Sequence, residues 1–184
     1  MSHMSTAAGA LAGVARAIES EQLTNPTPCS EFDVHALVHH LLYWGPPLAA
    51  AGRKESVAPS DMDMTAWREA LAAQLTRTVE AWAPASAWEG TTSMGPASTV
   101  GEMLVGELLV HAWATDQPLD VPDDLVAYVY DGVAASADQG REMGVYGPEV
   151  PVPAGAPMLD RLLGLTGRDP AWVSAGAAAP SAAR

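Results

Sequence analysis

The chain has 184 residues, 48% of them hydrophobic and 17% charged, which is typical of one globular domain rather than a disordered chain. Only nine Lys and Arg oppose 22 Asp and Glu, and this net charge of −13 argues against binding to nucleic acid or to an anionic membrane surface. We expect a cytoplasmic protein, because there is no apolar run of ~20 residues, no secretory signal, and a single cysteine that cannot form an internal disulfide.

The first half of the chain predicts three helices, from apolar residues that recur at i, i+3, i+4 and i+7. The first helix runs over about 6–22 and ends before the two prolines of TNPTPCSEF. Ser30, with Asp33 three residues later, resembles a capping box and opens the second helix, whose apolar stripe covers 34–48. After a polar loop, the third pattern covers 67–82.

The second half of the chain predicts two more long helices and a short one. Thr99 and Glu102 form a capping box for a helix over about 100–114. The next helix covers about 123–140, and the last covers 158–165. No stretch alternates for long enough to indicate a strand. The pattern therefore predicts an all-α helical bundle.

Glu107 and His111 are the strongest candidates for functional residues. On a wheel of the helix over 100–114, both lie at the centre of an apolar stripe, one turn apart, so both can reach one ion. Burying a carboxylate costs several kcal/mol unless it is paired or binds a cation. The pair is therefore either half of a metal site or a buried hydrogen-bonded pair without a metal.

A third ligand is sought among the histidines of the second helix. His39 points away from the apolar stripe and should be solvated, and His35 lies at its far edge. His40 flanks the stripe and could turn inward, although it could equally be an ordinary core or surface histidine. His40, Glu107 and His111 would supply two nitrogens and one oxygen, a set that suits zinc, with nickel, iron or manganese as alternatives.

Four further residues are candidates for the surroundings of this site. Trp44 and Trp113 lie near the proposed ligands and could line a substrate pocket. Arg141 could reach the end of the bundle from the fifth helix and join that pocket. Cys29 precedes the second helix, where a helix N-terminus lowers a thiol's pKa, but a structural or idle cysteine is the commoner case. No catalytic base can be assigned.

Three segments resemble the mycothiol-dependent maleylpyruvate isomerase and DinB-like superfamily. TPCSEFDVHALVHHL is similar to the start of that superfamily's second helix, and GELLVHAW to its E-x-x-x-H-x-W pattern. LDRLLGLTGRDPAW is similar to the ending of one actinobacterial subfamily. The resemblance implies a DinB-like four-helix bundle with a short extra C-terminal helix, which we place over 5–173, and it implies a divalent metal on His40, Glu107 and His111. The small, polar residues 174–184 predict a disordered tail.

The resemblance also implies a chemistry. Relatives use the metal to bind a low-molecular-weight thiol, mycothiol in actinobacteria, and a cation delivers such a thiol as thiolate to a small electrophile. A metal-dependent thiol transferase or isomerase is therefore expected. A thiol-independent hydrolase or natural-product tailoring enzyme on the same bundle is one alternative, and a non-catalytic bundle that has lost the metal is another. A homodimer is also conceivable.

The sequence departs from these relatives directly after Trp113. They usually continue H-x-W-D-L-A-R-A-T-G-Q-P, whereas here HAW runs into ATDQP, as if four residues were deleted. Four residues are about one turn, so the helix should end roughly 6 Å earlier. The Asp after the Trp is missing, and Asp116 replaces the usual Gly. Because such an Asp often orients a ligating histidine, we expect a differently shaped pocket mouth.

Overall fold

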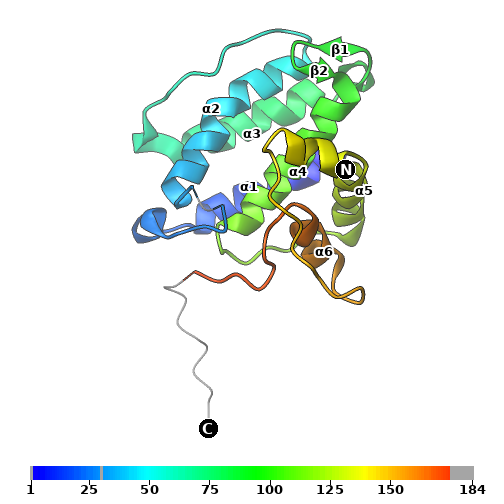
Figure 1. Cartoon of the computed structure of the whole chain (residues 1–184). Helices are drawn as coiled ribbons and strands as arrows, with labels where there is room; N and C mark the ends of the chain where they lie inside the picture. The colour runs from blue at the N-terminus through cyan, green and yellow to red at the C-terminus, as the bar shows by residue number, and fades with distance from the viewer. Residues whose placement is uncertain (1, 30, 175–184) are drawn as a thin grey trace.

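The computed structural model describes residues 2–29 and 31–174, and helices dominate it (Figure 1). The helices are α1 (His3–Ala17), α2 (Val34–Gly52), α3 (Trp67–Trp82), α4 (Ala97–Ala114), α5 (Asp123–Glu142) and α6 (Met158–Leu165). Three 3-10 helices lie between them, η1 (Ser20–Thr24), η2 (Met64–Ala66) and η3 (Ala85–Trp88). One small antiparallel hairpin joins β1 (Thr91–Thr92) to β2 (Gly95–Pro96). The predicted all-α fold is confirmed.

The first four helices form the bundle that carries the candidate site. α2 packs along α3, and α1 packs against both α3 and α4 (Figure 1). α5 packs on the outer side of α4 and holds α6. The largest fully buried side chains include Met4, Val38, Leu71, Trp82 and Leu109, so all four bundle helices contribute to one core. Each such side chain contributes about 1.5–3 kcal/mol by leaving water.

The entry into α2 is fixed by Asp33. Its carboxylate accepts a hydrogen bond from the backbone N–H of Ala36 at 2.7 Å, which satisfies one of the unpaired donors at the helix start. Asp33 also forms an isolated bridge with Pro26. The predicted capping role of Ser30 lies outside the described residues. The helix begins at Val34, the first residue of the predicted apolar stripe, with Asp33 as its N-cap.

The start of α4 also differs from the prediction. The helix begins at Ala97 directly after the hairpin, and no side chain caps it, so the predicted Thr99–Glu102 capping box is wrong. Instead, the backbone N–H of Ala97 donates to Gly90 O at 3.0 Å. Strands of two residues are too short to produce an alternating pattern, which is why the sequence did not reveal the hairpin. Met103, which a helical wheel places on the same apolar stripe as Glu107 and His111, is 38% exposed.

The remaining boundaries agree more closely, except at α1. This helix ends at Ala17 rather than near 22, because Ile18 is extended and buried and the chain restarts as η1. α5 is two residues longer than predicted, and α6 is as predicted. No helix among the described residues combines the length and apolarity of a membrane span. The predicted disordered tail lies outside the described residues, apart from Ser174.

Candidate metal centre

α2 and α4 bring together the three side chains proposed as metal ligands. One ligand atom from each of His40, Glu107 and His111 lies within 4.8 Å of the other two. Glu107 Oε2 is 3.1 Å from His111 Nδ1 and 3.5 Å from His40 Nε2, so the carboxylate lies between two imidazoles. The helical phase of α4 places Glu107 and His111 on one face, and the packing of α2 on α4 supplies His40.

His111 provides the test of whether these residues fit a cation. Its ring is 5% exposed, and its Nδ1 is buried without an aligned hydrogen-bond partner among the described residues. A buried nitrogen in this condition costs about 1–3 kcal/mol unless a ligand occupies it. Because Nδ1 faces the carboxylate of Glu107, a cation held between them would satisfy both groups. Two imidazole nitrogens and one carboxylate fit a divalent transition metal or zinc.

Without a cation, Glu107 and His111 form an ion pair. Burial would raise the pKa of the Glu107 carboxyl, but the charges of His111 and His40 and their hydrogen bonds together outweigh it and hold that pKa well below its usual range. Burial would lower the pKa of His111, but the charges of Glu107 and Cys29 and their hydrogen bonds together outweigh it and raise the pKa to about 9. At neutral pH a metal must therefore displace a proton from His111 to bind there.

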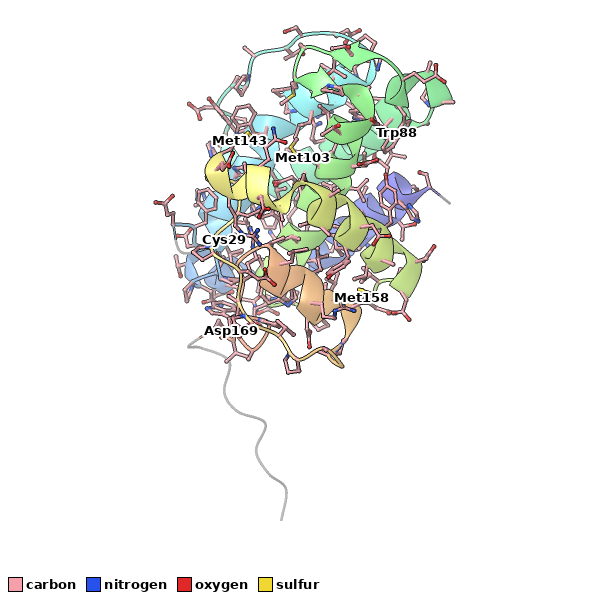
Figure 2. All side chains as sticks on the ribbon, turned by 45° about the vertical axis from the view of Figure 1, so that its right-hand side comes forward. Cys29, Trp88, Met103, Met143, Met158 and Asp169 are labelled. Carbon is pink, nitrogen blue, oxygen red and sulfur yellow. The ribbon has the colours of Figure 1, made fainter. Side chains whose placement is uncertain are left out.

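Cys29 lies against His111, next to the triad. Its thiol interacts with the His111 side chain, and its Sγ lies 3.7 Å from Nη2 of Arg168. Figure 2 shows Cys29 between the end of α5 and the C-terminal segment that carries Asp169. Burial raises the thiol's pKa, but His111 and the positive charge of Arg168 together lower it. The cysteine is thus part of the polar cluster rather than an isolated core residue.

A turn at the Thr-Pro-Cys segment holds Cys29 in place. The Thr27 hydroxyl accepts a hydrogen bond from the Cys29 backbone N–H at 3.1 Å. It also donates to the backbone carbonyl of Phe32 at 2.6 Å. Thr27 is buried, so these bonds fix the segment that leads into α2. The sequence pattern before α2 therefore positions a thiol as well as the helix that carries His40.

The structure places the two tryptophans differently. Trp44 lines a narrow cavity between α2, α3 and α4 that also reaches His40 and Glu107. Buried Gln74 and Thr78 supply the polar part of its wall, with the Gln74 amide donating to the Thr78 hydroxyl at 3.3 Å. The cavity is about 20 Å³, room for roughly one water. Trp113 instead packs against the hydrophobic core.

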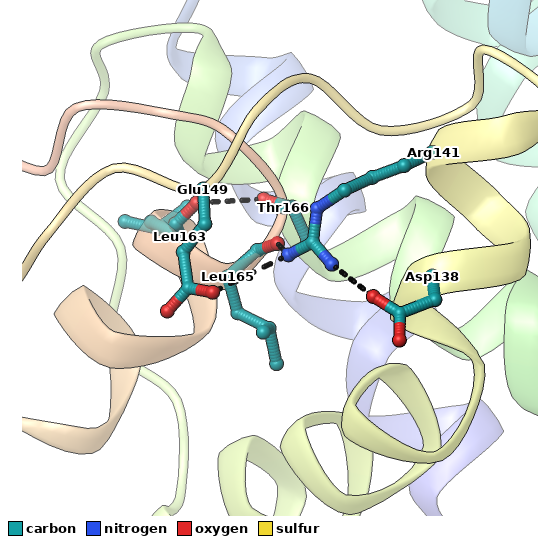
Figure 3. A network of polar contacts seen from close by, with 6 residues as sticks. All are labelled: Asp138, Arg141, Glu149, Leu163, Leu165 and Thr166. Atoms are coloured by element: carbon teal, nitrogen blue, oxygen red, sulfur yellow. Dashed lines mark hydrogen bonds and ion pairs between the residues drawn. The ribbon is translucent and has the colours of Figure 1, made fainter.

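Arg141 lies in a network that joins α5 to the end of α6 (Figure 3). Its Nη1 is 3.0 Å from Asp138 Oδ1, and its Nη2 is 3.0 Å from Leu165 O and 3.5 Å from Glu149 Oε2. None of the triad residues is among these contacts. Its assignment to a substrate pocket stays a prediction, and the recorded contacts are structural.

Sequence reasoning missed three residues near the triad, namely Gln74, Tyr146 and Arg168. Gln74 follows Leu71 at i+3 within the apolar stripe of α3, so the wheel argument used for Glu107 would have found it. Arg168 lies in the GRDPAW segment, whose likeness to a subfamily does not show where the guanidinium points. Tyr146 lies in an irregular loop, where periodicity carries no information about position.

Comparison with known proteins places these residues in a family context. The model of the family described as "Mycothiol maleylpyruvate isomerase N-terminal domain" matches residues 4–116. The matched range spans α1 to α4 and includes all three residues of the triad. Among curated proteins none matches, and the same holds for solved structures.

Proposed function

Because the chain belongs to the mycothiol maleylpyruvate isomerase N-terminal domain family, with a DinB-like all-α bundle, we propose that it is a metal-dependent enzyme acting on a small electrophilic molecule. Mycothiol is the proposed co-substrate, and the proposed reaction is thiol-dependent transfer or isomerisation. The observation that carries the proposal is the meeting of His40, Glu107 and His111, with the buried His111 Nδ1 facing the carboxylate of Glu107 without an aligned hydrogen bond.

The three side chains have separate parts in this proposal. His40 Nε2, His111 Nδ1 and a Glu107 oxygen would hold the metal, for which zinc is the first candidate. When bound, such an ion lowers the pKa of a coordinated thiol and so supplies thiolate at neutral pH. The strongly lowered pKa of Glu107 makes its carboxylate a weak base, which favours a role as ligand over a role as proton acceptor.

The surroundings shield one side of the triad from water, while the side chains of His40 and Glu107 each stay 28% exposed. His111 is buried by the bundle, and the cavity beside His40 and Glu107 is walled mainly by leucines from three helices. Trp44 is 39% exposed at this cavity and could cover an apolar part of a substrate. A thiolate on the His111 side of the triad would meet few competing water molecules, which protects it from protonation.

The experiment measures metal content and thiol binding separately. The metal-free chain is loaded with Zn²⁺ or Co²⁺, and the expected stoichiometry is about one ion per chain. His111→Ala should lose the ion, whereas His39→Ala is the matched control, because His39 is on the same helix as His40 but pairs with exposed Asp61 at 3.2 Å. Mycothiol added to the Co²⁺ form should change its visible spectrum through a thiolate–metal bond.

Two results would contradict the proposal. A wild-type chain that takes up no metal would remove the site and favour a non-catalytic bundle. In the second case, the chain binds the ion but shows no spectral change with mycothiol and needs no thiol for turnover. That result would favour a hydrolase or tailoring enzyme instead.

A further inference from the structure

Gln74 is a buried polar residue of α3 that lies beside the triad. It is 3% exposed, and it lines the narrow cavity that also reaches His40 and Glu107. Its side chain packs on the backbone of α2, because a Cβ on Gly45 would be only 2.6 Å from its Cγ. A buried amide is costly unless its hydrogen bonds are made, so its partners decide what this residue does.

Arg77 fixes which way the Gln74 amide points. Arg77 Nη2 donates to Gln74 Oε1 at 2.9 Å, and because a guanidinium can only donate, the amide oxygen must face Arg77. The amide nitrogen therefore lies on the other side, where it donates one hydrogen to Thr78 Oγ1 at 3.3 Å. The wall that α3 contributes to the cavity thus offers hydrogen-bond donors.

Two hydrogens of this pair have no recorded acceptor in the part of the chain that the structure describes. One is the second amide hydrogen of Gln74, and the other is the hydroxyl hydrogen of Thr78. Thr76, two residues earlier on α3, shows the common arrangement, in which the hydroxyl donates to a carbonyl of its own helix, Ala72 O, at 3.0 Å. Thr78 is 3% exposed, so solvent cannot replace such a bond. Both hydrogens are therefore available to an acceptor inside the cavity.

The opposite wall of the cavity supplies that acceptor. Glu107 Oε2 lies 3.1 Å from His111 Nδ1 and 3.5 Å from His40 Nε2, which leaves the second carboxylate oxygen for other donors. No direct hydrogen bond joins Gln74 to Glu107 among the described residues. The space of about 20 Å³ between the two walls fits one water. A water there would accept from the amide and the hydroxyl and donate to the carboxylate, which gives it the polar partners that a buried water needs.

We propose that Gln74 is a positioning residue of the metal centre, which holds one buried water against Glu107 with Thr78 as a second donor. The water fixes the rotation of the carboxylate, so that the ligating oxygen stays directed at both histidines. Hydrogen bonds of this kind to a ligand group typically change metal affinity about 10- to 100-fold. The effect on metal binding rests on the proposed function, whereas the water bridge needs neither metal nor turnover.

The bridge is tested on the metal-free chain by nuclear magnetic resonance. The side-chain N–H signals of Gln74, identified by their loss in Gln74→Met, should show a cross-relaxation peak with a long-lived water. Thr78→Val should keep this peak, because the water retains its bonds to Gln74 and Glu107. A peak that disappears in Thr78→Val would come from the exchanging hydroxyl of Thr78. That result, or a wild type without any such peak, overturns the bridge.

The effect on the metal centre is tested by Zn²⁺ titration and by the visible spectrum of the Co²⁺ form. Gln74→Met keeps the length of the side chain but removes the amide, so Zn²⁺ should bind about 10-fold more weakly and the Co²⁺ bands should shift. Thr78→Val should weaken Zn²⁺ binding about two- to fivefold. Thr76→Val is the matched control and should change neither, because its hydroxyl is exposed and bonds within α3. A merely structural Gln74 would change the stability of the chain but not the Co²⁺ spectrum.

Arg77→Met keeps the proposal testable if Gln74→Met fails to fold, because Arg77 is exposed. Without the guanidinium the amide can turn its oxygen toward the cavity, so Zn²⁺ should bind about two- to fivefold more weakly. Loss of a positive charge alone would strengthen the binding of a cation, which is a change of opposite sign. Wild-type Zn²⁺ affinity in each of these variants that folds overturns this inference alone. A water bridge in a wild-type chain that takes up no metal overturns the proposed function and leaves the bridge in place.

Discussion

His111 Nδ1 and Glu107 Oε2 lie 3.1 Å apart across one turn of α4, in a position where either a proton or a metal ion can neutralise the carboxylate. The proton and the metal therefore compete for one nitrogen. In the metal-free chain the imidazole is charged, and in a metal-bound chain it must be neutral. This competition makes proton release a measure of metal binding at the triad.

At pH 7, binding of Zn²⁺ should release about one proton from His111, because folding raises the pKa of this side chain to about 9. The released proton is measured by titration calorimetry in two buffers with different ionisation enthalpies. Above pH ~10 the release should disappear, since the imidazole is then already neutral. Binding that is independent of buffer at pH 7 would mean that the metal does not use Nδ1.

The stability of the metal-free chain should fall as pH rises from 6.5 through about 9. The pKa of His111 is raised from 6.5 to about 9, so its contribution is fully present below pH 6.5 and is lost above that window. The pKa of Glu107 is lowered from 4.5, so its contribution is present above pH 4.5 and is lost as pH falls further. Thermal unfolding across pH 4–10 should therefore show a Tm plateau between pH 4.5 and 6.5 and a decline in Tm on either side of it. In the Glu107→Gln variant both declines should be shallower. An equal slope in both proteins above pH 6.5 would contradict it.

Gly101→Ala should destabilise the fold by about 1–3 kcal/mol. A Cβ at this position would lie 2.5 Å from Trp88 and 2.8 Å from Trp82, two rings that pack edge to face. Gly9→Ala in α1 is the matched control, because a Cβ there meets nothing within 4 Å and removes only glycine's backbone freedom. Chemical denaturation measures both. A Gly101→Ala chain as stable as the control would show that the two tryptophans can move apart.

Asp33→Ala should lower the free energy of unfolding by about 1 kcal/mol, because it removes the side-chain cap of α2. Asp33→Asn keeps an oxygen acceptor and should lose little. Because α2 also positions His40, the alanine variant should additionally bind Zn²⁺ more weakly than the asparagine variant. Equal Zn²⁺ affinity in the two variants would show that the helix cap does not affect the metal site.

Arg141→Met should destabilise the chain by about 1–2 kcal/mol while leaving zinc affinity unchanged. The arginine joins α5 to the carbonyl of Leu165 at the end of α6, and it does not contact the triad. Denaturation and metal titration of the same variant distinguish a structural role, which joins α5 to α6, from a role in the substrate pocket. A large loss of substrate affinity with normal stability would instead support the pocket role first assigned to Arg141.

Most of the bundle could be predicted because helical periodicity is a local property of the sequence. The bounds of α3 and α6 follow from apolar spacing, and the phase of α4 placed Glu107 and His111 on one face. His40 could be predicted in the same way, from its position beside the apolar stripe of the second helix. The start of α4 was misplaced, because a backbone bond from Ala97 to Gly90 sets it rather than a side-chain cap.

The outer part of the site could not be found in the same way. Arg168 and Tyr146 lie in irregular segments after the bundle, so their approach to the triad depends on how α6 packs on α5. No spacing rule encodes that packing. Cys29 was visible in the sequence, but its contact with His111 depends on the turn that Thr27 holds and on the path of the chain into α2.

The contact between Cys29 and Arg168 joins residues 139 positions apart. During synthesis, the helices that carry the triad leave the ribosome well before Arg168 does, and a domain folds largely as its parts emerge. A nascent chain would therefore have its three metal ligands before it has the guanidinium. Such a chain could take up a metal ion before Arg168 reaches Cys29, so the contact beside the metal site would form after the site itself.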